Sequence, residues 1–147
     1  MKVLIISPGK AHDSTVKEGV AEYTKRLGKR ISLEWMFPAV GSKDEEGAAI
    51  LKALKKDDVV VLLDERGRSI DTSGFASMLD THLQSGTKRL VFVIGGAFGV
   101  SEAVAARAEA TLQLSKLVFP HMLVRLILAE QLYRAVSIID GGKYHHA

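Results

Sequence analysis

The final residues of the chain carry side chains suited to proton transfer and nucleic-acid contact. Lys143, Tyr144, His145 and His146 follow the pair Gly141-Gly142. Such side chains donate hydrogen bonds to phosphate, stack on bases and accept protons. A frayed terminus, the usual state of final residues, is the alternative. The tail is therefore a candidate for catalytic and RNA-binding chemistry.

A second polar group lies on an otherwise apolar stretch near residues 122–139. Glu130 and Arg134 are four residues apart, so an ordinary ion pair on one helical turn is the simplest interpretation. Charged side chains on a mostly apolar helix usually have a specific role, because they are costly to bury. Arg125 and Arg134 are nine residues apart and should point to roughly opposite faces. One helix could then serve two sites, or one site and one interface.

The run VFVIGGAFGVSEA, residues 91–103, has the outline of a nucleotide-binding turn. The dinucleotide fingerprint needs glycine at its first, third and sixth positions, but Ala97 and Val100 follow Gly95 at the last two. The Gly-Lys-Ser/Thr of a Walker loop is also absent. The usual binding modes of NAD, FAD and ATP are therefore poor matches. Three glycines after a strand still permit close approach of a ligand, although a plain strand-to-helix turn is equally compatible with them.

Several other classes of chemistry are excluded by composition. The chain has no cysteine, which removes disulfides and thiol nucleophiles and fits a reducing, cytoplasmic environment. No His or carboxylate spacing typical of a metal site occurs, and no Gly-x-Ser-x-Gly elbow occurs, so we expect no metal. His121, at the start of the last predicted helix, is interpreted as structural. A net charge of +3 permits an anionic partner without requiring one.

The elements that must position these residues are short apolar runs typical of strands, which alternate with segments of helical apolar spacing. Hydrophobic residues make up 47% of the 147 positions and charged residues 25%, which is typical of one globular domain over residues 1–147, and no segment is apolar enough for a membrane span. Helices with capping signals at Thr15–Glu18, Ser42–Glu45, Asp71 or Thr72, and Ser101 separate the predicted strands. The strands are Val3–Ile6, Ile31–Phe37, Val59–Leu63, Leu90–Ile94 and Thr111–Leu114.

This alternation predicts an α/β fold with a mostly parallel sheet of five to six strands and helices on both faces. Ligand sites in such sheets lie beyond the carboxyl ends of the strands, here at residues 7–10, 64–68, 95–99 and 115–119. The last helix, from Met122 to about Ile139, is apolar on more than one side. We interpret this as contact with a second subunit, with a central helix inside a monomer as the alternative.

Three segments together resemble one family. VIGGAFGVS, LSKLVFPHMLVRLILAEQLYRA and the terminal YHH are similar to the pattern of the small bacterial ribosomal RNA large-subunit methyltransferase H family of the SPOUT superfamily. The resemblance covers the whole chain and is strongest over its last 60 or so residues. It implies methyl transfer from S-adenosylmethionine to N3 of a pseudouridine in 23S ribosomal RNA, recognised in the assembled ribosome. It further implies a homodimer and a C-terminal trefoil knot.

The resemblance also implies site residues. Tyr144 and His145 are expected to be catalytic, with Arg134 as their electrostatic partner. The chain departs from the family at His146, where a more basic residue is common and a neutral histidine would bind phosphate less well. A SPOUT enzyme acting on tRNA and a non-catalytic ribosome-binding factor remain alternatives. The positions expected to bind the cofactor are Leu63, Gly95, Leu114, Ser115, Lys116, Leu117, Val118 and Phe119.

RNA docking is expected to use basic side chains on predicted loops and at the exposed end of the first helix. For each of them a solvated surface role is at least as compatible with the sequence. The chain has few aromatic residues to stack on free bases, which favours recognition of a large preformed surface over a single strand. The nominated residues are Lys10, Lys25, Arg26, Lys29, Arg30, Arg66 and Arg68.

Overall fold

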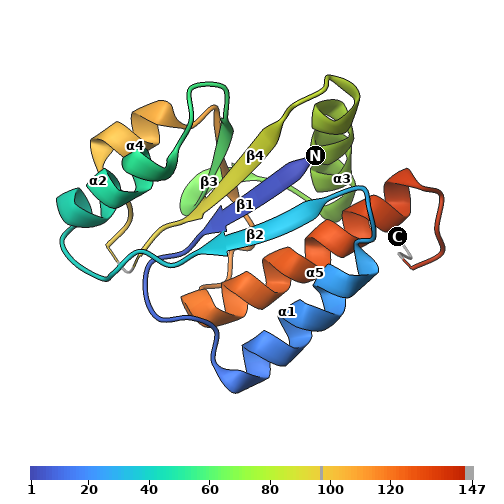
Figure 1. The fold of residues 1–147 in the computed structure, drawn as a ribbon, viewed down its shortest axis with the longest axis horizontal. Helices are drawn as coiled ribbons and strands as arrows, with labels where there is room; N and C mark the ends of the chain where they lie inside the picture. The colour runs from blue at the N-terminus through green and yellow to red at the C-terminus, as the bar shows by residue number, and fades with distance from the viewer. Residues whose placement is uncertain (97, 145–147) are drawn as a thin grey trace.

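The computed structural model describes residues 1–96 and 98–144, which form five strands and five helices in alternation (Figure 1). The predicted strands and helices are all present, with most ends shifted by one to three residues and β3 extended six residues beyond its predicted end. Their bounds are β1 Lys2–Ile6, α1 Ser14–Arg26, β2 Ser32–Met36, α2 Lys43–Ala53, β3 Val59–Ser69, α3 Thr72–Gln84, β4 Arg89–Ile94, α4 Glu102–Arg107, β5 Ala110–Gln113 and α5 His121–Ile139.

The strands form one sheet in the order β2-β1-β4-β3-β5, and every pairing in it is parallel. Helices α2 and α4 cover one face, and α1, α3 and α5 cover the other (Figure 1). A strand buried on both faces has no polar side to alternate with, which explains the continuous apolar runs. The predicted parallel α/β sheet with helices on both faces is therefore confirmed.

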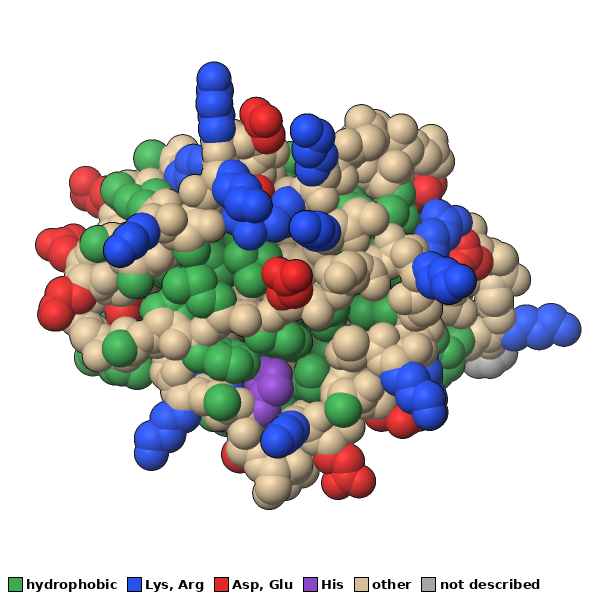
Figure 2. All heavy atoms as spheres, viewed as in Figure 1, with side chains coloured by type: hydrophobic (Ala, Val, Ile, Leu, Met, Phe, Trp, Pro, Cys, Tyr) green, Lys and Arg blue, Asp and Glu red, His purple; other side chains and the backbone are tan. Residues whose placement is uncertain are grey.

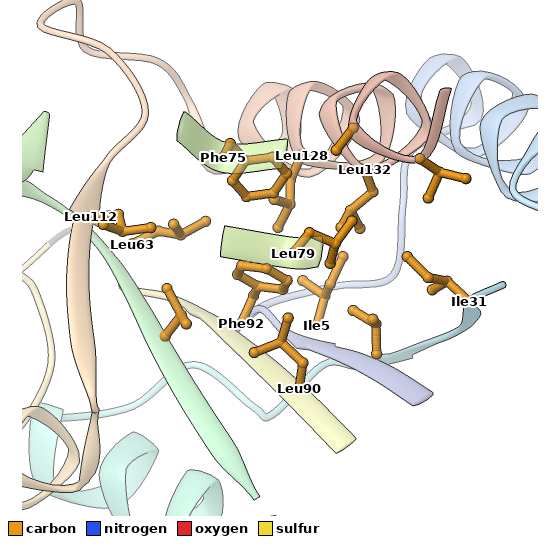
Figure 3. Close-up of a cluster of buried hydrophobic side chains, with 14 of the residues drawn as sticks. Ile5, Ile31, Leu63, Phe75, Leu79, Leu90, Phe92, Leu112, Leu128 and Leu132 are labelled. Atoms are coloured by element: carbon orange, nitrogen blue, oxygen red, sulfur yellow. The ribbon is translucent and has the colours of Figure 1, made fainter. Parts of the chain in front are cut away.

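Successive side chains of the central strands point to opposite faces of the sheet and pack into two separate hydrophobic cores. In β4, Phe92 joins the core beneath α3 and α5, while Val91 and Val93 join the one beneath α2 and α4. Figure 3 shows the first core, where Phe92 lies near Phe75 of α3, with ring centroids 5.9 Å apart. Burial on both faces fixes the register of the central strands.

The helix starts follow capping chemistry. Ser42 and Glu45 form the predicted capping box, with each side chain accepting from the other residue's backbone N–H. The predicted box at Thr15 is wrong, because the carboxylate of Asp13 caps α1 by accepting from Val16 N at 2.9 Å. A carboxylate at the N-cap outcompetes a hydroxyl two residues later for the same free N–H groups.

Strand β3 is longer than predicted and crosses its neighbour. Leu63 and Arg68 both pair in parallel with Leu112 of β5. A strand residue can pair with one neighbour on each of its two edges, so Leu63 and Arg68 lie on opposite edges of β5. The chain must therefore pass across β5 between these two residues. Gly67 lies at this crossing, where an added Cβ would come within 2.8 Å of the backbone N and C of Leu112. Arg66 and Arg68 thus belong to β3, and their prediction as loop residues is wrong.

No helix in residues 1–96 and 98–144 is both long and apolar enough to cross a membrane. The trefoil knot implied by the family resemblance stays a prediction.

Candidate functional site

A cavity of about 720 Å³ opens beyond the ends of strands β4 and β5, beside the middle of β3 and the start of helix α5. Parallel sheets place ligand sites at this edge, and the volume suits a small-molecule cofactor. Its walls come from three segments far apart in sequence. Its lining comprises Leu63, Asp64, Glu65, Arg66, Ile94, Gly95, Gly96, Phe98, Gly99, Leu114, Ser115, Leu117, Val118, Phe119, Pro120, His121 and Val124.

The structure brings the predicted cofactor residues together around this cavity. Leu63 ends the buried part of β3, Gly95 follows β4, and the segment 114–119 follows β5. Of the eight nominated positions, only Lys116 is absent from the lining among the described residues. Its side chain is exposed. The gathering of these three segments is a direct result of parallel strand order.

The three glycines of the turn after β4 serve different purposes. Gly99 has a φ of +85°, so the turn itself requires it. An added Cβ at Gly96 would lie 2.9 Å from Oε1 of Glu46, so that glycine accommodates a side chain of α2. At Gly95 a Cβ would meet nothing closer than Val100, at an ordinary 3.5 Å. The fold therefore places no steric demand on Gly95, and a glycine there leaves the backbone open to close approach.

Large apolar side chains at the cavity are left open to solvent. The lining residues Phe98, Leu117 and Val118 are 83%, 71% and 80% exposed, and Leu123, which precedes the lining residue Val124 in α5, is 40% exposed. Grouped exposed apolar residues typically mark a binding surface for a ligand or another protein. The cavity thus has an apolar wall that a flat aromatic ring or a partner chain could cover.

One ion pair lies inside the cavity lining. The Asp64 carboxylate accepts hydrogen bonds from Arg66, at 2.8 Å from the backbone N, 3.1 Å from Nε and 3.1 Å from Nη2. The Asp64 side chain is only 9% exposed, whereas that of Arg66 is 77% exposed. The hydrogen bonds from Arg66 hold the pKa of Asp64 below its ordinary value, against burial, which acts to raise it. Asp64 is therefore an anion at neutral pH.

Helix α5 carries a fully buried arginine one turn after its start. Arg125 donates to Ser7 Oγ at 2.8 Å and to the carbonyl of Lys10 at 2.8 Å, and its guanidinium lies 4.6 Å from the Phe37 ring centroid. Burial lowers the pKa of Arg125 from its usual value. These contacts tie the loop after β1 to the first turn of α5, beside the cavity residue His121.

The predicted catalytic residues form a second cluster at the other end of α5. Arg134 donates to the Glu130 carboxylate from Nε at 2.8 Å, which confirms the ion pair expected from their spacing. Tyr144 donates to the same carboxylate at 3.3 Å, and its ring lies 4.5 Å from the Arg134 guanidinium and 4.6 Å from the Tyr133 ring. The prediction for His145 lies outside the described residues.

The two clusters are separated along the helix. Val124 lines the cavity, and Arg134 lies ten residues further along α5. With a rise of 1.5 Å per residue, the helix separates them by about 15 Å. Figure 1 shows α5 as one unbroken helix. A single chain therefore does not bring Arg134 and Tyr144 to its own cavity.

Basic side chains are spread over the surface. Figure 2 shows Lys and Arg around the edges of one face, with hydrophobic side chains reaching the surface between them. Three of the nominated RNA-docking residues already have partners, since Arg26 pairs with Glu22, Arg30 with Asp140 and Arg66 with Asp64. Within the described part of the chain, no group of three or more metal-ligating side chains is present.

Sequence reasoning did not single out Asp64 or assign Arg125 its buried role. Asp64 could have been found, because it directly follows Leu63 at a predicted strand end, where ligand sites gather. The burial of Arg125 had no sequence signal, since the Ser7 hydroxyl and the Lys10 carbonyl that accept from it lie more than a hundred residues away.

Comparisons with known proteins find relatives over nearly the whole chain. Residues 1–145 match a family model described as "Predicted SPOUT methyltransferase". A protein from Geotalea daltonii named "Ribosomal RNA large subunit methyltransferase H" is 40% identical over 157 residues, covering 99% of this chain and 100% of its own. A protein of the same name from Alkalilimnicola ehrlichii is 44% identical over 157 residues and covers both chains fully.

Solved structures share the fold, and one of them matches most of this chain. It is described as a probable methylase family protein from Haemophilus influenzae Rd KW20 and superposes with a TM-score of 0.55. The match covers 95% of this chain and 66% of that one at 12% identity, so it concerns the fold alone.

Proposed function

Because the chain belongs to the SPOUT methyltransferase family, we propose that it methylates N3 of a pseudouridine in 23S ribosomal RNA, using S-adenosylmethionine and acting on the assembled ribosome. The observation that carries the proposal is the cavity formed by Leu63, the Gly95 turn and residues 114–119. Full-length relatives named as ribosomal RNA large-subunit methyltransferases support the choice of substrate.

The cavity residues fit this cofactor. Leu114, Leu117 and Phe119 offer an apolar slot for adenine, and the bare backbone at Gly95 leaves room for the ribose. S-adenosylmethionine carries no phosphate, so the pocket needs neither a dinucleotide fingerprint nor a Walker lysine. When bound, it supplies an electrophilic methyl group on a sulfonium. The broken glycine spacing of residues 95–100 is compatible with such a pocket.

The chain's own residues must hold the nucleotide and take its N3 proton. Burial raises the pKa of Tyr144 above its ordinary value, and a hydrogen bond with Tyr23 and the nearby Glu130 carboxylate add to the rise. Tyr144 therefore keeps its proton at neutral pH. We assign it the role of positioning the pseudouridine base through its O–H group and its ring. This assigns proton removal to His145, with Arg134 stabilising the anion that forms.

We further propose a homodimer in which the site is completed across two copies of the chain. The separation of about 15 Å along α5 supports this arrangement, because the tail cluster does not reach the cavity of its own chain. The exposed Phe98, Leu117, Val118 and Leu123 supply apolar surface for the contact. A cytoplasmic location follows from a ribosomal substrate.

Calorimetry with S-adenosylmethionine, followed by methyl incorporation, tests the proposal. Ribosomes, free subunits and tRNA from a strain lacking this protein serve as substrates. Methylation of a 23S pseudouridine in ribosomes is the expected result. Methylation of tRNA instead would assign the enzyme to another SPOUT class, and no binding at millimolar cofactor would leave a non-catalytic ribosome-binding factor.

A further inference from the structure

The only carboxylate in the cavity lining that is largely shielded from solvent, among the described residues, is that of Asp64. It lies between two walls of the cavity, directly after Leu63 and against the turn that follows β4. An added Cβ at Gly99 would lie 3.9 Å from Asp64 Oδ2 and 3.2 Å from Arg66 Nη2. The ion pair therefore rests on the same glycine turn as the proposed cofactor contact.

The partner of this carboxylate is poorly anchored. Arg66 reaches Asp64 from only two residues away, and 77% of its side chain is exposed to solvent. Ion pairs with such an exposed member add little stability, because solvent screens them and the long side chain loses freedom. A different cation placed in the cavity would meet a charged, pre-oriented acceptor at small cost.

The methyl donor and the spent product differ in charge at one atom. S-adenosylmethionine has a positive sulfonium, whereas S-adenosylhomocysteine has a neutral thioether at the same place. Both keep the amino-acid ammonium and carboxylate groups. A cavity lined only by apolar groups and backbone would have no electrostatic means to tell them apart, and product would compete with the donor.

Resting on the function proposed above, we propose that Asp64 determines donor specificity by recognising the positive sulfonium, with Arg66 as the counter-ion that it exchanges for the donor. Leu63 and Gly95 hold the parts common to donor and product. Asp64 then favours donor over product, and release of Arg66 exposes a cation at the rim of the cavity.

Binding constants of three compounds test this assignment. S-adenosylmethionine, S-adenosylhomocysteine and sinefungin, which carries an amine in place of the methylated sulfonium, are titrated calorimetrically into wild type and variants. In Asp64→Asn the affinities for the two cationic compounds should fall about ten-fold, the effect of one nearby charge, while that for S-adenosylhomocysteine stays within about two-fold. Arg66→Gln should tighten the cationic compounds selectively, and the double variant should lose this gain.

Two variants control for charge and folding. Glu65→Gln removes a neighbouring exposed carboxylate at the cavity rim and should leave the donor-to-product ratio unchanged. Asp64→Glu keeps the charge and should keep the preference, and melting curves verify that each variant folds. Equal loss of affinity for donor and product in Asp64→Asn, or no loss in either, overturns the assignment. Wild type binding none of the compounds would instead refute the proposed function itself.

Discussion

Gly67 and Leu112 lie backbone against backbone, with no space for a side chain between them. A Cβ on Gly67 would come within 2.8 Å of both N and C of Leu112, neither of which can move without disturbing the sheet. Replacing Gly67 by Ala should therefore lower the free energy of unfolding by about 2 kcal/mol, through overpacking at the crossing. Urea denaturation of the two proteins measures this difference.

The control for that experiment is Gly95→Ala, whose added Cβ makes only ordinary contacts in the fold. Equal stability of the Gly67→Ala variant and wild type would mean that the crossing can relax at no cost.

Gly95→Ala should affect the cofactor and leave the fold unchanged. The added methyl group would project where a ligand must approach the backbone, so we expect the affinity for S-adenosylmethionine to fall about ten-fold or more. Calorimetry measures the affinity, and the melting temperature should match that of wild type. Unchanged affinity would move the cofactor away from this turn.

Asp58 should make the protein acid-sensitive. Its carboxylate accepts from Arg89 Nε at 2.9 Å and Nη2 at 2.6 Å, and from Lys55 N at 2.7 Å. Although burial acts to raise it, these bonds and the charge of Arg89 hold the pKa of Asp58 below its ordinary value. The folded pKa is thus below the unfolded value of about 3.9, so the stabilisation is present above that pH and is lost as pH falls through the folded pKa.

Asp58→Ala should cost about 3 kcal/mol at neutral pH, because it leaves the largely buried charge of Arg89 without its carboxylate partner. Urea midpoints from pH 7 down to pH 3 should show a smaller decline for this variant than for wild type. Glu22→Ala breaks an exposed pair with Arg26 and should cost less than about 0.5 kcal/mol. Parallel acid profiles for wild type and Asp58→Ala would contradict the assignment.

Mixed dimers should recover activity from two inactive proteins. Gly95→Val blocks the cavity, and Arg134→Ala removes the electrostatic partner of the tail. If the site is completed across subunits, random exchange gives mixed dimers with one intact site each, and the mixture should reach about a quarter of wild-type activity. Methyl incorporation into ribosomes measures the recovery. A mixture no more active than its two components would place both halves of the site in one chain.

Much of the fold could be read from the sequence, because its strands are short, β-branched and bounded by glycine and polar residues. The short apolar run from Leu90 to Ile94 predicts a strand, and the glycine turn marks where that strand ends. Parallel order then places Leu63, Gly95 and residues 114–119 at one edge. The place of the proposed cofactor cavity, whose residues the family resemblance implies, could thus be anticipated from the sequence.

The extension of β3 could not be anticipated. Residues 64–68, with four charged side chains and a glycine, have the composition of a loop, yet they continue β3 across β5. Their pairing depends on contacts with Leu112 and Gln113, which local pattern does not reveal. The distance between the tail cluster and the cavity likewise emerges only when α5 is seen as one unbroken helix.

The crossing at Gly67 also affects the order in which parts of the sheet fold. Residues 68 and 69 have no strand to pair with until residues 112 and 113, more than forty positions later in the chain, are in place. Closing a loop of that length is entropically slow, so docking of these two segments should be a late event in folding. During synthesis the edge of the sheet that builds the cavity would remain unfinished until β5 has left the ribosomal tunnel, long after β1 to β4 can begin to pack.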